Sequence, residues 1–209
     1  MAKFRNKYRI ESARLQGWDY RNSGAYFITI CTHGRVHHFG KCENGRMKLS
    51  TLGLIVQGCW FEIPRLNSHV RLGEFIVMPN HVHGILILES LNLDDVDDVE
   101  TFYKTSVRGV RNDGDVRDVD ANTKKEFHQN ISPKSGSVSR IIQQFKRAGT
   151  YHIKLVESLN FNGSTLGNFK WQSRFHDHII RDDESFVRIS NYIVNNPLKW
   201  MEDKFYGDE

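Results

Sequence analysis

The sequence predicts an α+β fold in which helices cover one face of an antiparallel β-sheet. Segments rich in β-branched and aromatic residues alternate with segments whose apolar residues recur at helical spacing. Outside one polar stretch, the order of these segments is strand, helix, strand, strand, helix, strand, followed by a last helix. This βαββαβ order is typical of ferredoxin-like or RRM-like sheets, and we expect it to leave the second face of the sheet free for a substrate.

Four segments are predicted to be strands because β-branched and aromatic residues fill them. Pro79-Asn80 breaks the pattern between two of them and predicts a short turn that pairs them. A short hairpin is expected around Gly45, inside the turn-rich stretch that follows the first strand. The predicted strands are 25–32, 70–78, 83–88 and 169–175, the last of them a short strand or an extended segment that 178–180 continues.

Three segments are predicted to be helices because their apolar residues recur three or four positions apart. The first helix begins after a cap at Ser50 or Thr51 and ends near Ile63, where Pro64 closes it. Its apolar face is expected to comprise Leu54, Ile55, Cys59 and either Trp60 or Phe61.

The second predicted helix begins at Ser137 or Ser139 and carries an apolar stripe on one side. The third helix covers about 184–195 and ends at Asn196-Pro197, because a residue before proline resists the helical conformation. The stripes are Val138, Ile141, Ile142 and Phe145 in the second helix, and Phe186, Ile189 and Ile193 in the third.

The composition predicts one domain over residues 1–209, with a long mobile insertion at 92–134. Hydrophobic residues make up 39% of the 209 residues, which is enough for one buried core. The insertion is acidic at first and then mixed in charge, with few large apolar residues. No apolar run reaches the roughly 18 residues of a membrane helix, and the basic start lacks the apolar stretch of a signal peptide. We therefore expect a cytoplasmic protein.

Charge and cysteine content narrow the classes of function. The net charge of +4 permits nucleic-acid binding without establishing it. In segment 3–21, cations lie among aromatic residues, a mixture that suits single-stranded DNA; a solvated basic tail is the alternative. The three cysteines form no CxxC pair, which argues against disulfides and against a zinc–thiolate site.

The stretch MPNHVHG at 78–84 is the densest chemical signal. Alternate residues of a strand share a face, so His81 and His83 should project together while Val82 points into the core. Two adjacent imidazoles suit a divalent cation, although an HxH pair by itself is often incidental.

A second signal lies on the last predicted helix, where Tyr192 and Asn196 are four residues apart and therefore stand one above the other. Both lie beside the apolar stripe, so we expect them to emerge at the edge of the sheet. A half-buried structural tyrosine followed by a helix-ending asparagine is the alternative.

A third signal is the segment KWQSRFHDHIIR at 170–181. His176 and His178 alternate on one side of the extended chain, and Arg174 and Arg181 could contact phosphates. Trp171 could stack on a base, or it could be a structural tryptophan among surface charges.

Four blocks together carry a family resemblance. In this order and spacing, MPNHVHGILIL, SVSRIIQQFKRAGT, KWQSRFHDHIIR and YIVNNPLKW resemble the REP-associated tyrosine transposases, relatives of the single-tyrosine HUH transposases of bacterial insertion sequences. The upstream GWDYRNSGAYFITICT is similar to the opening strand of that family. The resemblance covers nearly the whole chain except about 92–134.

The resemblance implies roles for particular residues. His81 and His83 match the metal ligands of the HUH motif, and Tyr192 matches the nucleophile. Asn196 stands where insertion-sequence relatives have a metal-holding glutamine, which is longer by one methylene. Tyr151 is a rival nucleophile outside the matching block. The third protein ligand stays open, with Asn196, Glu74 and His178 as candidates in that order.

The function implied is a transposase-type endonuclease and strand transferase that acts in DNA transposition and recombination. It would cleave single-stranded or hairpin DNA, such as REP-like or transposon-end sequences, through a 5′-phosphotyrosine intermediate. The cofactor would be Mg²⁺ or Mn²⁺, since Mg²⁺ prefers oxygen ligands and Mn²⁺ tolerates imidazole. Candidate DNA contacts are Arg5, Lys7, Arg9, Lys146, Arg147, Trp171, Arg174 and Arg181.

Other interpretations of the same residues remain open at this point. The chain could be a noncatalytic RRM-like nucleic-acid-binding protein, or a metal-dependent hydrolase whose nucleophile is water. Insertion-sequence relatives act as dimers and REP-associated ones can work as monomers, so the sequence allows a monomer or a homodimer.

Overall fold

A computed structural model describes residues 3–4, 7–8, 15, 17–90, 133–159 and 169–206. The predicted insertion at 92–134 lies outside these residues except for its last two, and so do Arg5 and Arg9. Two short strands, β1 (Lys3–Phe4) and β2 (Lys7–Tyr8), pair with each other antiparallel.

The centre of the fold is a four-stranded sheet in which all neighbours are antiparallel. Its strands, in the order β6-β7-β3-β8, are Val70–Val77, His81–Leu88, Gly24–Cys31 and His176–Ile180. This order and direction confirm the predicted ferredoxin-like βαββαβ sheet.

The fourth strand is not where composition placed it. Segment 169–175 forms only an isolated bridge between Trp171 and Thr32, and the strand itself is β8, at 176–180. The reason is packing: the rings of Phe169 and Trp171 lie against Phe39 at centroid distances of 5.7 and 5.4 Å, so aromatic content here marks core contacts.

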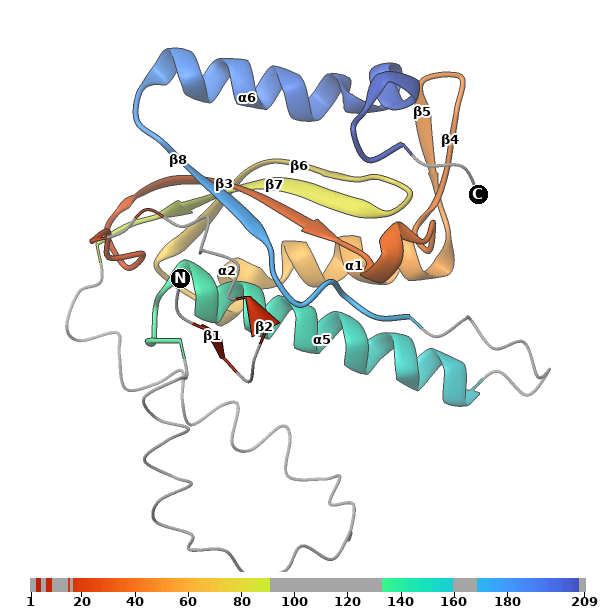
Figure 1. Ribbon diagram of the computed structural model, residues 1–209, viewed down its shortest axis with the longest axis horizontal. Coiled ribbons are helices and arrows are strands. Elements are labelled where there is room, and N and C mark those ends of the chain that lie inside the picture. The colour runs from red at the N-terminus through yellow and green to blue at the C-terminus, as the bar shows by residue number, and fades with distance from the viewer. Residues whose placement is uncertain are drawn as a thin grey trace, which may run out of the picture.

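Helices α1 (Thr51–Phe61), α2 (Ile63–Leu66) and α5 (Val138–Leu159) cover one face of the sheet (Figure 1). The Ser50 hydroxyl accepts a hydrogen bond from the Gly53 amide at 3.1 Å, which is the predicted N-terminal cap. Pro64 does not stop the helical path. It lies in the first turn of α2, where the missing N–H of proline is not needed.

The predicted apolar face of α1 was right in part. Trp60 is buried, and Ile55 and Cys59 pack against the core as predicted, whereas Leu54 and Phe61 are exposed. The prediction missed two buried residues, Leu52 and Val56. Apolar residues lie almost all round this helix, so their spacing alone could not select the buried side. The stripe of α5 is buried as predicted.

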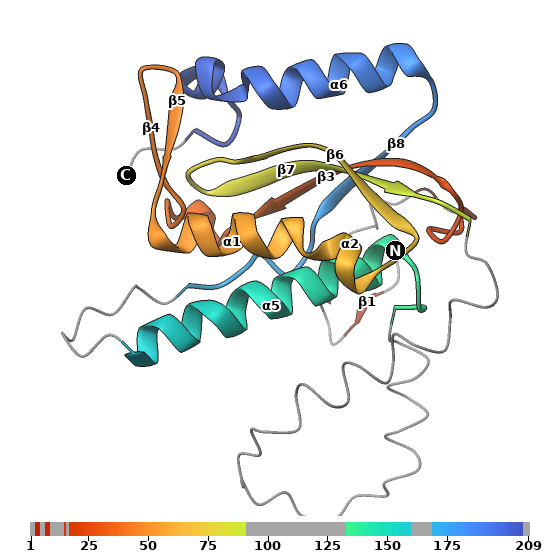
Figure 2. The same cartoon turned by 180° about the vertical axis from the view of Figure 1, so that it is seen from behind.

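Helix α6 (Asp183–Asn195) lies on the opposite face of the sheet from α1 and α5 (Figure 2). Ile193 of α6 packs with Ile85 and Ile180 of the sheet, and Phe186 and Ile189 pack against this cluster. The expectation of a free second face was therefore wrong where α6 lies, because an apolar helical stripe must be buried against something.

After α6 the chain continues as the 3-10 helix η3 (Asn196–Glu202), with Pro197 in its first turn. The predicted hairpin around Gly45 is formed by β4 (Gly40–Glu43) and β5 (Arg46–Leu49). Asn44 and Gly45 both have positive φ, as a two-residue hairpin turn requires. A short 3-10 helix, η1 (His33–Arg35), follows β3. None of the described helices combines the length and apolar composition needed to cross a membrane.

Gly84 allows the core to close around β7. It is the last residue of the HVHG stretch and faces α1, where the Trp60 indole ring occupies the space that a Cβ atom would need. Trp60 is fully buried and its ring stacks on Phe75 with a centroid distance of 4.6 Å. A glycine is therefore required at this position by packing.

We predict that Gly84→Ala lowers the free energy of unfolding by about 1–3 kcal/mol, because the added methyl group overpacks the Trp60 site. Chemical denaturation measures the loss. Gly58→Ala in α1 is the control: nothing lies near its missing Cβ, so it should raise stability by about 0.4–1 kcal/mol. Equal effects of the two substitutions would contradict this account.

Candidate metal centre and tyrosine site

Two buried histidines form the centre of the site. Strand β7 pairs with β3 so that His83 lies opposite Thr29 and His81 opposite Cys31, and both imidazoles project to the α6 side. The two Nε2 atoms are 3.0 Å apart, and the side chains are 0% and 1% exposed. Val82 points the other way, into the main core, as strand alternation predicts.

The side chain of Asn80 determines which nitrogen of His81 carries a proton. The Asn80 amide nitrogen donates to the carbonyl oxygens of Arg35 at 3.1 Å and Phe205 at 2.8 Å, which uses both of its hydrogens. Its oxygen must then accept from Nδ1 of His81, at 2.8 Å. The Nε2 atom of His81 therefore presents a lone pair to His83, the form in which a histidine binds a metal.

The hydrogen-bond partner of His83 leaves the position of its proton open. Its Nδ1 atom lies 2.8 Å from the Thr29 hydroxyl, which can donate or accept. With the proton on Nδ1, both Nε2 atoms present lone pairs to each other, an arrangement that a shared cation stabilises. With the proton on Nε2, His83 donates to His81. Bonds from a metal ion to imidazole nitrogen are about 2.0–2.1 Å long, so two Nε2 atoms 3.0 Å apart are close enough to bind one cation together.

Tyr192 stands beside this pair, on α6. Its hydroxyl oxygen lies 3.3 Å from Nε2 of His83, and its ring meets the Phe27 ring edge to face at 6.1 Å. Tyr192 is 41% exposed and lines a pocket of about 760 Å³ between α6, η3 and the sheet. Burial, followed by the charge of Asp203, raises the pKa of the Tyr192 hydroxyl. The hydroxyl is thus protonated at neutral pH and open to the pocket.

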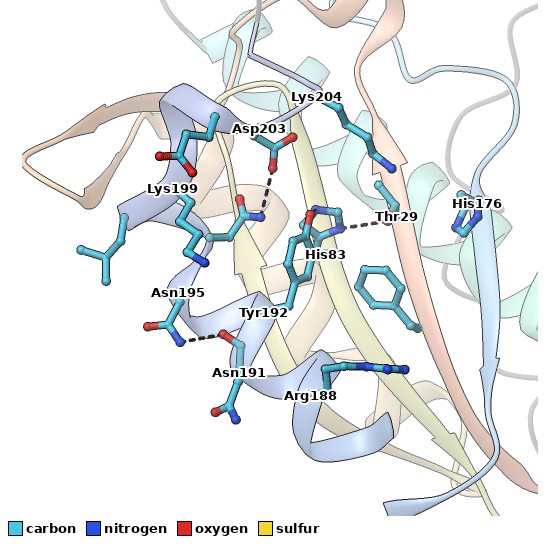
Figure 3. A pocket seen from close by; sticks show the side chains of 14 residues that line it. Thr29, His83, His176, Arg188, Asn191, Tyr192, Asn195, Lys199, Asp203 and Lys204 are labelled. Atoms are coloured by element: carbon cyan, nitrogen blue, oxygen red, sulfur yellow. Dashed lines mark hydrogen bonds between the residues drawn. The ribbon is translucent and has the colours of Figure 1, made fainter. Parts of the chain in front are cut away.

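Asp203, just after η3, completes the group and was missed in the sequence. Ligand atoms of His81, His83 and Asp203 all lie within 4.8 Å of one another. One Asp203 carboxylate oxygen accepts from the Phe205 amide at 2.8 Å. The other accepts from the Asn196 side-chain amide at 3.1 Å, the dashed line drawn to Asp203 in Figure 3. No periodic pattern could have shown this, because Asp203 lies beyond the proline break in an irregular segment.

Asn196 is buried, and its side-chain oxygen has no hydrogen-bond partner among the described residues. A buried carbonyl oxygen without a partner is costly, so its position beside Asp203 favours a ligand there. Two imidazoles, a carboxylate and an unpartnered amide oxygen make a donor set that fits a divalent cation. Of the other candidates for a third ligand, Glu74 and His178 are exposed and belong to no metal-ligating group that the described residues form.

The pKa values of the two histidines also favour the neutral, metal-binding form. Burial lowers the pKa of His81 to about 3, with further lowering by the charge of Lys204. Burial likewise lowers the pKa of His83 well below its usual range, followed by the effect of His81. Cations occupy the open part of the same pocket: Arg188, Lys199 and Lys204 line it, together with His176 of β8 (Figure 3).

Two of the expected DNA contacts, Lys146 and Trp171, have hydrogen-bond partners within the fold. The Lys146 ammonium group donates to the carbonyl oxygens of Gln172 at 2.7 Å and Arg174 at 3.1 Å, and burial lowers its pKa to about 8. The Trp171 indole donates to the Lys146 carbonyl oxygen at 3.1 Å and packs on the core. These contacts match the structural alternative for Trp171, and contact of either side chain with DNA stays a prediction.

The remaining sequence-predicted residues are spread over the fold. Arg147 is exposed on α5, and Arg174 and Arg181 are exposed at the two ends of β8, the edge strand nearest the pocket. The side chain of Lys7 is outside the described part of the chain, as are Arg5 and Arg9. Tyr151, the rival nucleophile, is exposed on α5, on the opposite side of the sheet from His81 and His83.

We predict that the free energy of unfolding of the metal-free protein falls as the pH is lowered below about 6.5. Unfolded His81 binds a proton below its ordinary pKa, whereas folded His81 resists protonation down to about pH 3. The unfolded state therefore holds more protons in this window, and stability is lost by about 1.4 kcal/mol per pH unit for each such histidine.

Urea denaturation between pH 7.5 and 5 measures this slope. His81→Gln should flatten it, whereas His152→Gln, at an exposed position of α5, should keep the wild-type slope. An unchanged slope in His81→Gln would exclude His81 as a source of this pH dependence.

Comparisons with known proteins agree with this geometry. No protein-family model matches the chain. An uncharacterized protein of Haemophilus influenzae is 34% identical over 201 residues, which cover 94% of this chain and 93% of that protein. A solved REP-associated tyrosine transposase bound to a REP hairpin matches with a TM-score of 0.53 and 17% identity, over 94% of this chain and 77% of that chain. The chain therefore belongs to one family with the Haemophilus influenzae protein and has the fold of a REP-associated tyrosine transposase.

Proposed function

We propose that this chain is a transposase-type DNA endonuclease that cleaves single-stranded or hairpin DNA through a covalent bond to Tyr192. One observation carries the proposal. The Tyr192 hydroxyl lies 3.3 Å from His83, in a group where His81, His83 and Asp203 bring their ligand atoms within 4.8 Å. A nucleophile adjoining a metal-ligating group at the wall of an open pocket suits phosphodiester chemistry.

A divalent cation would be held by Nε2 of His81 and His83 and by the Asp203 carboxylate. The unpartnered oxygen of Asn196, whose amide nitrogen donates to Asp203, is a further candidate ligand. When bound, such a cation polarises the scissile phosphate and offsets the charge that builds on its nonbridging oxygens. Two imidazoles and one carboxylate suit Mn²⁺ better than Mg²⁺, which prefers oxygen ligands alone. Asn80 and Thr29 hold the two rings in position for this role.

The chain supplies the nucleophile and its placement. Tyr192 gives up its hydroxyl proton, and its oxygen forms a bond to phosphorus as the bond from phosphorus to the 3′ oxygen breaks. The 3′ oxygen takes up a proton and leaves as a hydroxyl group, and the 5′ phosphate stays on Tyr192. One phosphoester bond replaces another, so the step needs no nucleotide hydrolysis and the 3′ hydroxyl can reverse it.

Single-stranded or hairpin DNA is the substrate class that the pocket supports. The pocket is open, and cations line it beside the tyrosine, at Lys199 and Lys204. The Lys204 ammonium group lies 4.9 Å from the centre of the Phe205 ring, and that ring is tilted against the His81 ring at a centroid distance of 4.5 Å. The solved relative of the same fold is bound to a REP hairpin, and we propose a hairpin with a single-stranded flank here too.

Other cations extend the proposed contact surface. Arg174 and Arg181 flank the pocket-side edge strand, and Arg147 is exposed on α5. Arg5, Lys7 and Arg9 remain proposed contacts on the basis of the sequence alone.

We predict that the protein forms a denaturant-resistant adduct with labelled hairpin DNA in Mn²⁺, and that Tyr192→Phe abolishes it because the attacking oxygen is gone. Gel electrophoresis under denaturing conditions detects the adduct. The DNA comes from the flanks of the protein's own gene. Tyr151→Phe is the matched control and should form the adduct at the wild-type level.

An adduct that survives Tyr192→Phe would assign the nucleophile to another residue. Cleavage without any covalent species would favour a hydrolase that uses water. Binding that is unchanged in Tyr192→Phe, with no cleavage in either protein, would favour the noncatalytic binding module.

We also predict that Asp203→Asn weakens Mn²⁺ binding by roughly tenfold or more, because it removes a charged ligand while keeping the size of the side chain. Isothermal titration calorimetry measures the affinity without DNA. Glu202→Gln removes a neighbouring charge in the same pocket, outside the metal-ligating group, and should change affinity far less. Equal losses of affinity in both variants would mean that Asp203 acts on the cation through its charge alone and not as a ligand.

A further inference from the structure

We infer that Phe27, His176 and Arg188 form a nucleotide subsite beside Tyr192, in which the Phe27 ring stacks on one base of the bound single strand. The inference deepens the proposed function, since it takes single-stranded DNA as the ligand, but it concerns binding and not the cleavage step. All three residues line the tyrosine pocket.

Phe27 lies on the floor of that pocket. It belongs to the central strand β3 and shares the α6-facing side with Thr29, two residues further on. Its ring is half-buried, 5.2 Å from the His83 ring and edge-on to Tyr192. Helix α6 covers the neighbouring Ile85 completely but leaves Phe27 partly open. Part of the Phe27 ring therefore remains open to the pocket, next to His83 and Tyr192.

Arg188 supplies a cation at the same place. It is one helical turn before Tyr192 on α6, so the two side chains emerge on the same side of the helix. Figure 3 shows Arg188 reaching from α6 across the pocket toward β8. Its guanidinium group is exposed and makes a 3.3 Å hydrogen bond to Ser185, and no ion pair with any described residue. It is therefore available to a phosphate.

His176 lines the side of the pocket that β8 forms. It projects from β8, directly opposite Thr29 in the strand register, and is exposed. Thr29 lies between His176 and His83, so the row across the sheet leads from the edge strand to the metal-ligating pair. A nucleotide over Phe27 would have its phosphate within the span between His176 and Arg188.

This combination favours a single strand over other ligands. An open aromatic ring recognises the face of a base, which only unpaired nucleotides expose, and a neighbouring arginine recognises the phosphate. In the pocket lining, Arg188, Lys199 and Lys204 outnumber the two carboxylates, of which Asp203 belongs to the metal-ligating group. A polyanion therefore fits the charge of the pocket better than a neutral or acidic peptide does. Stacking on an aromatic side chain typically changes affinity by about tenfold per base.

The experiment uses the full-length protein and hairpin DNA with 2-aminopurine placed, one position at a time, along the single-stranded flank. Stacking on Phe27 should quench the fluorescence at one or two adjacent positions. Phe27→Leu should remove this quenching and weaken binding about tenfold, whereas Phe27→Trp should keep both. Phe61→Leu, at an exposed phenylalanine of α1 on the other side of the sheet, is the matched control and should bind like the wild type.

Arg188→Gln should weaken binding and lower its salt dependence, because one phosphate contact is lost. Lys154→Gln removes an equal charge from an exposed position on α5 and should leave both unchanged. Quenching that persists in Phe27→Leu, quenching at no position, or equal effects of Phe27→Leu and Phe61→Leu would overturn the subsite.

The adduct assay separates this inference from the proposed function. Position-specific quenching in a protein that forms no adduct leaves the subsite standing and removes the endonuclease. A Phe27→Leu protein that binds DNA and forms the adduct as the wild type does keeps the endonuclease and removes the subsite.

Discussion

The side-chain amide of Asn80 is the constraint on which the site depends. With two donated hydrogen bonds and one accepted, it joins the segment after β3, the start of β7 and the end of the chain near Phe205. Because its nitrogen donates both hydrogens to those two carbonyl oxygens, the atom that faces His81 is its oxygen. An amide oxygen only accepts, so the proton of His81 is fixed on Nδ1. The same amide therefore sets the chemical state of His81 and holds the C-terminal segment where Asp203 can join the histidines.

Three separate apolar clusters position the pieces of the site. The main core lies between the sheet and α1 and α5, and includes Trp60 and Val82. A second cluster joins Met78 to Trp200 and Phe205, and so anchors the segment that carries Asp203. A third, around Ile85 and Ile193, holds α6. Each proposed reacting group thus rests on a different cluster, with the sheet as the common support.

Sequence patterns predicted the parts of this arrangement that repeat. The alternation in HVH placed His81 and His83 on one face, and the stripe of the last helix placed Tyr192 beside buried residues. Patterns failed where no repeat exists. Asp203 comes from an irregular segment. Trp171 is of a residue type that can stack on a base, but its indole donates to a backbone carbonyl and its neighbours are core residues. In α1, where apolar residues lie nearly all round, periodicity could not select the buried side.

The small size of the α6 cluster has an energetic consequence. The described part of this cluster has only three buried side chains, Ile85, Ile180 and Ile193, and it is separated from the main core by the sheet. Helix α6, which carries Tyr192, can therefore separate from the sheet in a local opening whose free energy is well below that of global unfolding. Substitutions in α6 would then shift where the nucleophile rests, or how often it is in place, while the sheet and the histidine pair keep their structure.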